Sequence, residues 1–246
     1  MLFDCEARTG REFRQRDTVS NPVDTTLYLI IATLVFLGIH IVPSTPLRAL
    51  AVKSIGEGAY VGLFALASLA GLVWMASAYK GAPIQALWPG LRLVPIAALP
   101  FAFILLVCGL LGRNPTAVAQ AGALKNPEPA RGIIRVTRHP VMWAIMLWAL
   151  AHLLALGTLQ GAIFFGGLLL LAAAGTSLQD ARKAKALGED WQRFVALTSN
   201  VPFAAIAQGR NRMAWGEIGW LKPTVGLAAF ALVLYFHPWL FGFRAY

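Results

Sequence analysis

Charged residues are scarce in this sequence. They make up 13% of the 246 residues, against roughly 25% in a typical soluble domain. An intrinsically disordered chain is excluded, because disorder requires low hydrophobicity and 58% of these residues are hydrophobic. Cysteine is nearly absent too: Cys5 and Cys108 are the only two, and Cys108 lies in an apolar run. A small scaffold held together by disulfides is therefore excluded as well.

Long segments lack charge altogether. Four of them carry no Asp, Glu, Lys or Arg: residues 27–47, 58–79, 93–112 and 223–243. A helix needs about 20 apolar residues to cross the hydrocarbon core, so each of these predicts one span. The uncharged stretch 139–179 is long enough for two spans, with a turn at Gly157–Gly161. The sequence therefore predicts an all-α, polytopic transmembrane helical bundle of about six spans.

The basic residues gather in the segments between these spans. The net charge of +10 does not indicate nucleic-acid binding, because Lys and Arg are placed as in membrane proteins. Fourteen of the 21 lie after the first, third and fifth predicted spans, and seven lie on the other side. The richer side is expected to be cytoplasmic, which puts both termini outside.

The first 26 residues are polar and rich in arginine. They have no apolar core segment, so they do not form a signal peptide. We expect residues 1–26 to be a disordered extension and residues 27–246 to form one transmembrane domain.

The segment after the fifth predicted span has an amphipathic pattern. Its apolar residues Leu187, Trp191, Phe194 and Val195 recur at helical spacing among charged neighbours. This pattern predicts a cytoplasmic amphipathic helix. The helix either lies on the membrane surface or packs against the bundle.

All four histidines lie in or beside predicted spans: His40, His139, His152 and His237. Ionisable groups inside a membrane are costly and point to function. Counted along the helices, His152 and His237 reach a similar depth, while His139 lies at the inner boundary beside Arg138. Neutral imidazoles from different helices suit the axial positions of an iron porphyrin. They also suit ordinary hydrogen bonds between helices.

Several motifs resemble one family. They are Phe36–Ser44 (FLGIHIVPS), Gly112–Ala117 (GRNPTA), Arg135–Pro140 (RVTRHP), Trp148–Leu154 (WALAHLL), Leu187–Trp191 (LGEDW) and Thr198–Phe203 (TSNVPF). The chain resembles the NnrU family of bacterial membrane proteins and, through it, the plant 15-cis-zeta-carotene isomerases. The resemblance extends from about residue 27 to residue 241.

The resemblance implies a location and a cofactor. The NnrU family is associated with nitrite and nitric oxide respiration, which implies a bacterial plasma membrane. The plant relatives isomerise a carotenoid double bond with a b-type haem, which implies a lipophilic small-molecule substrate and haem b. His40 and His152 match the motifs as haem ligands, whereas the depth count pairs His152 with His237. No Cys-x-x-Cys-His motif is present, so haem would be held without a covalent bond.

A second family shares part of the pattern. Arg138-His139-Pro140 and the segment 188–203 are similar to isoprenylcysteine-type membrane methyltransferases, which bind S-adenosylmethionine. That resemblance implies a cofactor site at Arg138 and His139. Where that family has a pair of glutamates, this sequence has only Asp180, and Arg138 and His139 also suit a plain helix start before Pro140. A third hypothesis is a non-catalytic assembly or regulatory factor for denitrification.

Overall fold

The computed structural model describes residues 22–117 and 120–242. Most of the predicted extension 1–26 therefore lies outside the described residues. The first helix, α1 (Pro22–Ile41), begins within that predicted extension. Its first residue is proline, whose missing N–H costs nothing in the first turn of a helix.

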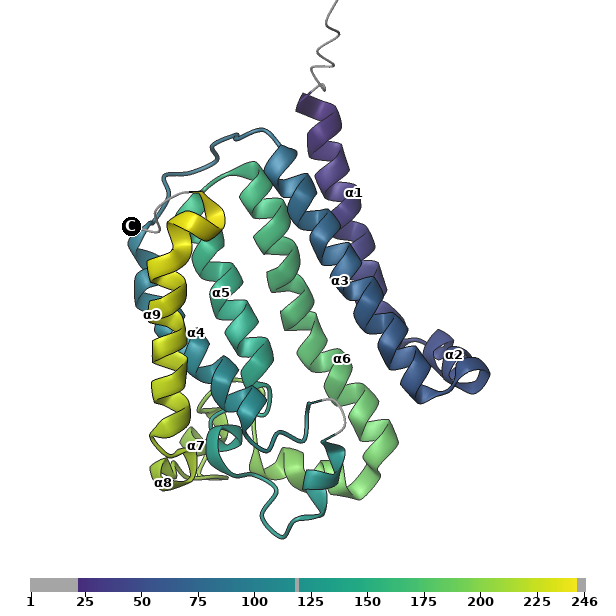
Figure 1. Ribbon diagram of the computed structural model, residues 1–246. Helices are drawn as coiled ribbons and strands as arrows, with labels where there is room; N and C mark the ends of the chain where they lie inside the picture. The colour runs from purple at the N-terminus through teal and green to yellow at the C-terminus, as the bar shows by residue number, and fades with distance from the viewer. Residues whose placement is uncertain (1–21, 118–119, 243–246) are drawn as a thin grey trace, which may run out of the picture.

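Long helices account for most of the described chain (Figure 1). Besides α1 they are α3 (Glu57–Gly81), α4 (Leu93–Leu111), α5 (Pro140–Leu156), α6 (Leu159–Leu197) and α9 (Leu221–Phe241). Five of the six are long and apolar enough to cross a membrane. The sixth, α5, has 17 residues, which is the lower limit of the usual range of about 17–25. The prediction of an all-α polytopic membrane protein is confirmed.

Short helices connect the long ones. They are η1 (Val42–Ser44), α2 (Pro46–Ile55), η2 (Ala121–Lys125), η3 (Gly132–Arg135), α7 (Ala204–Ala207) and α8 (Trp215–Ile218). The described residues contain no strand, only an isolated bridge between Ala86 and Thr158.

The long helices pack as a row of neighbours. In order, α9 packs on α4, α4 on α5 and α5 on α6, while α1 and α3 pack on each other and on the other side of α6 (Figure 1). The start of α1 and the end of α9 lie at the same end of the bundle as the α5–α6 turn, here called the hairpin end. The opposite end carries η2, η3, α7 and α8 and is called the loop end. Which end faces the cytoplasm remains a prediction from the charge count.

The predicted turn between the fourth and fifth spans is confirmed. Gly157 ends α5 in the left-handed conformation (φ 61°). The Thr158 hydroxyl then accepts a hydrogen bond from the Gly161 N–H at 3.3 Å and caps α6. Left-handed backbone costs glycine least, and a threonine cap satisfies an N–H that the helix leaves free.

The predicted amphipathic helix is the last part of α6. The helix bends at Gly188, which has φ 51° and ψ −125°. Beyond the bend, Trp191 and Phe194 are buried in a cluster with Ile134 and Cys108. Of the two placements left open by the sequence, the structure has the helix packed against the bundle.

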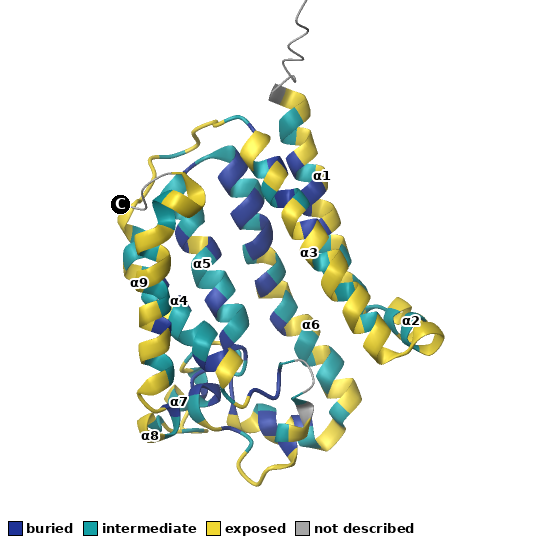
Figure 2. Ribbon diagram, in the orientation of Figure 1, coloured by how far each residue is buried: buried dark blue, intermediate teal, exposed yellow. Residues whose placement is uncertain are grey.

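The outer faces of the long helices are apolar and exposed (Figure 2). Exposed residues include Leu66 of α3, Phe101 of α4, Leu170 of α6 and Leu232 of α9. A soluble protein rarely exposes such continuous apolar surface, so these faces are the ones that contact lipid.

Candidate functional site

The structure divides the four predicted histidines between the two ends of the bundle. His152 and His237 lie near the ends of α5 and α9, at the hairpin end. His40 lies in the last turn of α1, toward the loop end, and His139 immediately precedes α5 at the loop end. Within the described residues, no three His, Cys, Asp or Glu side chains gather as a metal site.

His152 is held by α5 and α6. Its Nδ1 lies 2.8 Å from the Trp148 carbonyl oxygen and donates to it. The imidazole stacks on Phe165 of α6 with ring centroids 5.1 Å apart, and Trp148 contacts its other side at 5.1 Å. Because Nδ1 carries the hydrogen, Nε2 keeps its lone pair, which is how an imidazole is prepared to bind a metal.

The two possible partners of His152 differ in position. His237 lies near the end of α9, at the same end of the bundle as His152, and packs on Phe241 with ring centroids 4.7 Å apart. His40 has the same internal bond as His152, from its Nδ1 to the Phe36 carbonyl oxygen at 2.8 Å. It lies, however, on α1, across α6 from the α5 helix that carries His152.

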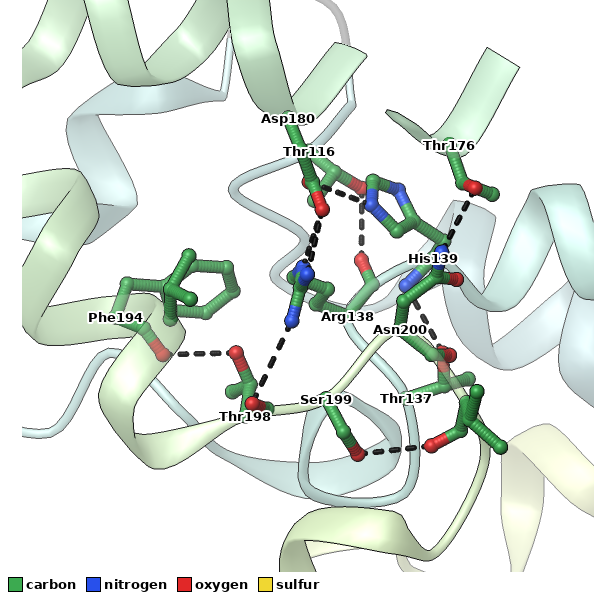
Figure 3. Close-up of polar contacts among 12 residues, drawn as sticks. Thr116, Thr137, Arg138, His139, Thr176, Asp180, Phe194, Thr198, Ser199 and Asn200 are labelled. Atoms are coloured by element: carbon green, nitrogen blue, oxygen red, sulfur yellow. Dashed lines mark hydrogen bonds and ion pairs between the residues drawn. The ribbon is translucent and has the colours of Figure 1, made fainter. Parts of the chain in front are cut away.

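Arg138, His139 and Asp180 form a buried ionic cluster at the loop end (Figure 3). Arg138 donates from Nε and Nη2 to Asp180 Oδ2 at 2.9 and 2.5 Å, and His139 Nε2 lies 2.7 Å from Asp180 Oδ1. The exposed fractions of these side chains are 12% for Arg138, 0% for His139 and 19% for Asp180. The cluster joins the start of α5 to the point where the apolar part of α6 ends.

Backbone contacts hold this cluster in place. The Arg138 N–H donates to the Ser199 carbonyl at 2.9 Å, and the Thr137 hydroxyl donates to the Asn200 carbonyl at 2.6 Å. The Asn200 amide in turn donates to the Thr176 hydroxyl on α6 at 2.8 Å (Figure 3). The segment after α6 is thus bonded to both α5 and α6.

The segment that follows α4 also packs against the Arg138–His139–Asp180 cluster and hydrogen-bonds to it. The Thr116 hydroxyl lies 3.0 Å from the Arg138 carbonyl oxygen and 2.6 Å from Asn114 Oδ1. Asn114 also donates to the Gly109 carbonyl at 3.2 Å, and Lys183 donates to the Pro115 carbonyl at 2.8 Å. Three of the motif segments, Gly112–Ala117, Arg135–Pro140 and Thr198–Phe203, therefore meet at one place.

From the sequence, Asp180 stood out only as the single carboxylate at the place where the methyltransferases have two glutamates. Its role as the common acceptor for Arg138 and His139 was missed, together with the buried polar residues Asn114 and Thr176. One signal existed: Asp180 is the first charge after the uncharged stretch 139–179. Such a carboxylate at a span boundary needs a partner. His139 Nδ1 is buried and makes no hydrogen bond within the described residues.

A second ion pair joins α8 to η3. Arg135 donates from Nε and Nη2 to the two carboxylate oxygens of Glu217, each at 2.8 Å, and the Gly132 N–H donates to Oε2 at 2.8 Å. The Arg135 hydrogen bonds lower the pKa of Glu217 to about 2, and the same hydrogen bonds raise the pKa of Arg135. The carboxylate is therefore charged throughout the neutral range.

Comparison with known proteins identifies the family. The family model described as NnrU protein matches residues 28–245. The chain belongs to the NnrU family. The resemblance drawn from the motifs is confirmed.

Two curated relatives of this NnrU protein are plant enzymes. The chloroplastic 15-cis-zeta-carotene isomerase of Zea mays is 27% identical over 250 residues, which covers 97% of this chain and 67% of the maize protein. The enzyme of the same name from Arabidopsis thaliana is 42% identical over 80 residues, or 32% of this chain and 22% of the plant protein. No solved structure matches this chain. Both relatives are named as chloroplastic proteins, so the location of this chain in a bacterial plasma membrane stays a prediction.

Proposed function

We propose that this NnrU protein isomerises a double bond of a lipophilic polyene inside the membrane, with a b-type haem held by His152. Similarity to 15-cis-zeta-carotene isomerase over 97% of the chain supports the reaction class. The apolar, lipid-facing helices suit a substrate that partitions into the bilayer. The observation that carries the proposal is the geometry of His152.

His152 has the arrangement expected of a haem ligand. The bond from Nδ1 to the Trp148 carbonyl fixes the tautomer and the ring direction, so that Nε2 keeps its lone pair. Phe165 and Trp148 pack on the half-buried ring and restrict its orientation. When bound there, haem would supply an iron centre able to act as a Lewis acid on the polyene double bond.

We propose His237 as the second ligand. Its place near the end of α9, at the same end of the bundle as His152 on α5, supports this pairing. His40 matches the family motif, but it lies in the last turn of α1, toward the loop end, whereas His152 and His237 both lie near the hairpin end. His40 is therefore the matched control: an imidazole with the same internal hydrogen bond on the other side of α6.

The methyltransferase alternative needs Arg138 and His139 to face a cofactor. Both side chains bond Asp180 instead, and of their ring and guanidinium nitrogens only His139 Nδ1 is buried without a partner among the described residues. The structure gives this alternative no support. A role in assembling denitrification enzymes is likewise not supported by any contact among the described residues.

The test combines a spectrum with an activity. Wild type, His152→Ala, His237→Ala and His40→Ala are purified from haem-sufficient cells, and the Soret absorbance per protein is compared. We expect a Soret band in wild type, a shifted or weakened band in His152→Ala and His237→Ala, and an unchanged band in His40→Ala. Removing one axial imidazole changes the iron's ligand field, which the band reports.

The activity is measured on proteoliposomes supplied with 15-cis-zeta-carotene, with products separated by chromatography. A wild type without haem would refute the cofactor, and a haem-loaded wild type that leaves the polyene unchanged would refute the reaction. If His40→Ala alters the Soret band and His237→Ala does not, the family motif identifies the second ligand and our pairing is wrong.

A further inference from the structure

A basic cavity lies at the loop end, the opposite end of the bundle from His152 and His237. Its volume is about 280 Å³. Its walls come from the end of α4, the loop before α5, α8 and the first turn of α9: Cys108, Gly112, Arg113, Arg131, Gly132, Ile133, Glu217, Ile218 and Lys222. The cavity is therefore assembled from four separate parts of the chain.

The charges around this cavity do not balance. Three cations, Arg113, Arg131 and Lys222, line it together with one carboxylate, Glu217. That carboxylate is already occupied by Arg135 and by the Gly132 N–H. Within the described part of the chain, neither Arg113 nor Lys222 forms an ion pair. The cavity thus has an excess of positive charge that an anion would neutralise.

The cavity lies at the level of lipid headgroups. Trp220 and Trp239, near the two ends of α9, are 76% and 69% exposed. Exposed tryptophans mark both membrane–water interfaces, and these two are 19 positions apart in sequence, which corresponds to about 28 Å at about 1.5 Å per residue. This length agrees with a hydrocarbon core of about 30 Å. Lys222 follows Trp220 by two residues, so it lies at the interface.

The walls of the cavity differ in polarity. Arg113 and Lys222 adjoin the ends of α4 and α9 and Arg131 precedes η3, while Cys108, Ile133 and Ile218 form a buried apolar side. A pocket for a drug-sized molecule has about 300–1,000 Å³, so this cavity fits a headgroup and not a whole lipid. Basic pockets between transmembrane helices characteristically bind anionic lipid heads.

We propose that this cavity binds the phosphate headgroup of an anionic phospholipid, with Arg113 and Lys222 contacting the phosphate and Arg131 at its rim. The site is independent of the proposed isomerase and of its haem. It would hold a lipid between the ends of α4 and α9, the outermost pair of neighbours in the row.

The experiment is a lipid titration of the delipidated protein, followed by native mass spectrometry. The probes are dioleoylphosphatidylglycerol and dioleoylphosphatidylcholine, which differ in net charge. The test variant is Arg113→Gln with Lys222→Gln. The control is Lys125→Gln with Lys185→Gln, which removes two exposed cations from the same end that do not line the cavity. A basic side chain near an anionic lipid raises the affinity by about a factor of five. The test variant lacks two such side chains, so it should bind phosphatidylglycerol about 30-fold more weakly.

Three results would overturn the proposal. One is equal affinity of wild type for the two lipids. Another is a loss in the Lys125/Lys185 control as large as in the cavity variant, which would indicate general charge attraction. The third is displacement of phosphatidylglycerol by excess inorganic phosphate, which would show that the cavity takes free phosphate and not a lipid. Phosphatidylglycerol that stays bound in excess phosphate and is lost only in the cavity variant supports the lipid site.

Discussion

Removing the carboxylate of Asp180 should destabilise the protein strongly. Asn in its place leaves the largely buried guanidinium of Arg138 without its counter-charge and removes the carboxylate oxygen that His139 Nε2 contacts. Breaking a buried ion pair by removing one partner costs about 3–5 kcal/mol. Since 19% of the Asp180 side chain is exposed, we expect the lower figure, about 3 kcal/mol. For a chain of this length that corresponds to a melting temperature about 6–12 °C lower.

The assay is thermal unfolding in detergent, followed by the intrinsic fluorescence of the tryptophans. The matched control is Asp190→Asn, which breaks the ion pair with Arg193. The exposed fractions there are 71% for Arg193 and 42% for Asp190, so the cost should stay below about 1 kcal/mol. Equal shifts for Asp180→Asn and Asp190→Asn would refute the reasoning, because burial would then not decide the energy.

A double variant refines this test. Arg138→Leu with Asp180→Leu removes both charges at once and replaces them with apolar side chains. Such replacements of a whole buried pair are often close to neutral. The double variant should therefore melt above Asp180→Leu alone, with a coupling of at least about 1 kcal/mol. Strictly additive losses would mean that the two side chains contribute independently.

Two further predictions use the same melting assay. Arg135 holds the folded-state pKa of Glu217 at about 2, against an ordinary pKa of 4.5. The charged carboxylate therefore stabilises the protein fully at pH values above 4.5, and this stabilisation is lost as the pH falls toward 2. Glu217→Gln should thus melt below wild type at pH 7, with the gap narrowing below about pH 4.5; a gap independent of pH would contradict this. Gly157→Ala should cost about 2 kcal/mol or more of stability, because Gly157 has φ 61° and an added Cβ would lie 2.2 Å from the Trp88 carbonyl oxygen. The control is Gly166→Ala, whose Cβ meets nothing within 4 Å and which should be neutral or stabilising by up to about 1 kcal/mol. Similar losses at both sites would show that the turn imposes no constraint.

The spans could be predicted because the signal is local. Each uncharged segment must satisfy its own backbone hydrogen bonds in lipid, so apolar length alone predicts a helix. The turn at Gly157 was predictable for the same reason, since glycine and a capping threonine are adjacent in sequence. The packed position of Trp191 and Phe194 was not, because an amphipathic face fits a membrane surface as well as a protein surface.

The polar cluster could not be predicted from sequence spacing. Thr116 and Asp180 reach Arg138 across 22 and 42 residues, and such contacts depend on how the helices pack. The sequence showed that a carboxylate follows a long uncharged stretch, but not which cation it meets. The depth count rests on the fixed rise per residue in a helix, and it paired His152 with His237; both lie near the ends of their helices at the hairpin end, and the pairing itself stays a prediction.

The motifs that carry the family resemblance lie at different ends of the bundle, and their positions indicate which ones maintain the fold. Gly112–Ala117, Arg135–Pro140 and Thr198–Phe203 converge on the Asp180 cluster, where most polar groups already bond to one another. A group that is satisfied within the protein has little left to offer a substrate. These segments therefore fix how α4, α5 and α6 meet at the loop end. Sequence similarity in these segments indicates a shared fold. In the proposed function, the chemistry depends on Trp148–Leu154, which places His152 among aromatic rings at the opposite end. If that proposal holds, substitutions in this segment should change the reaction and leave the fold intact.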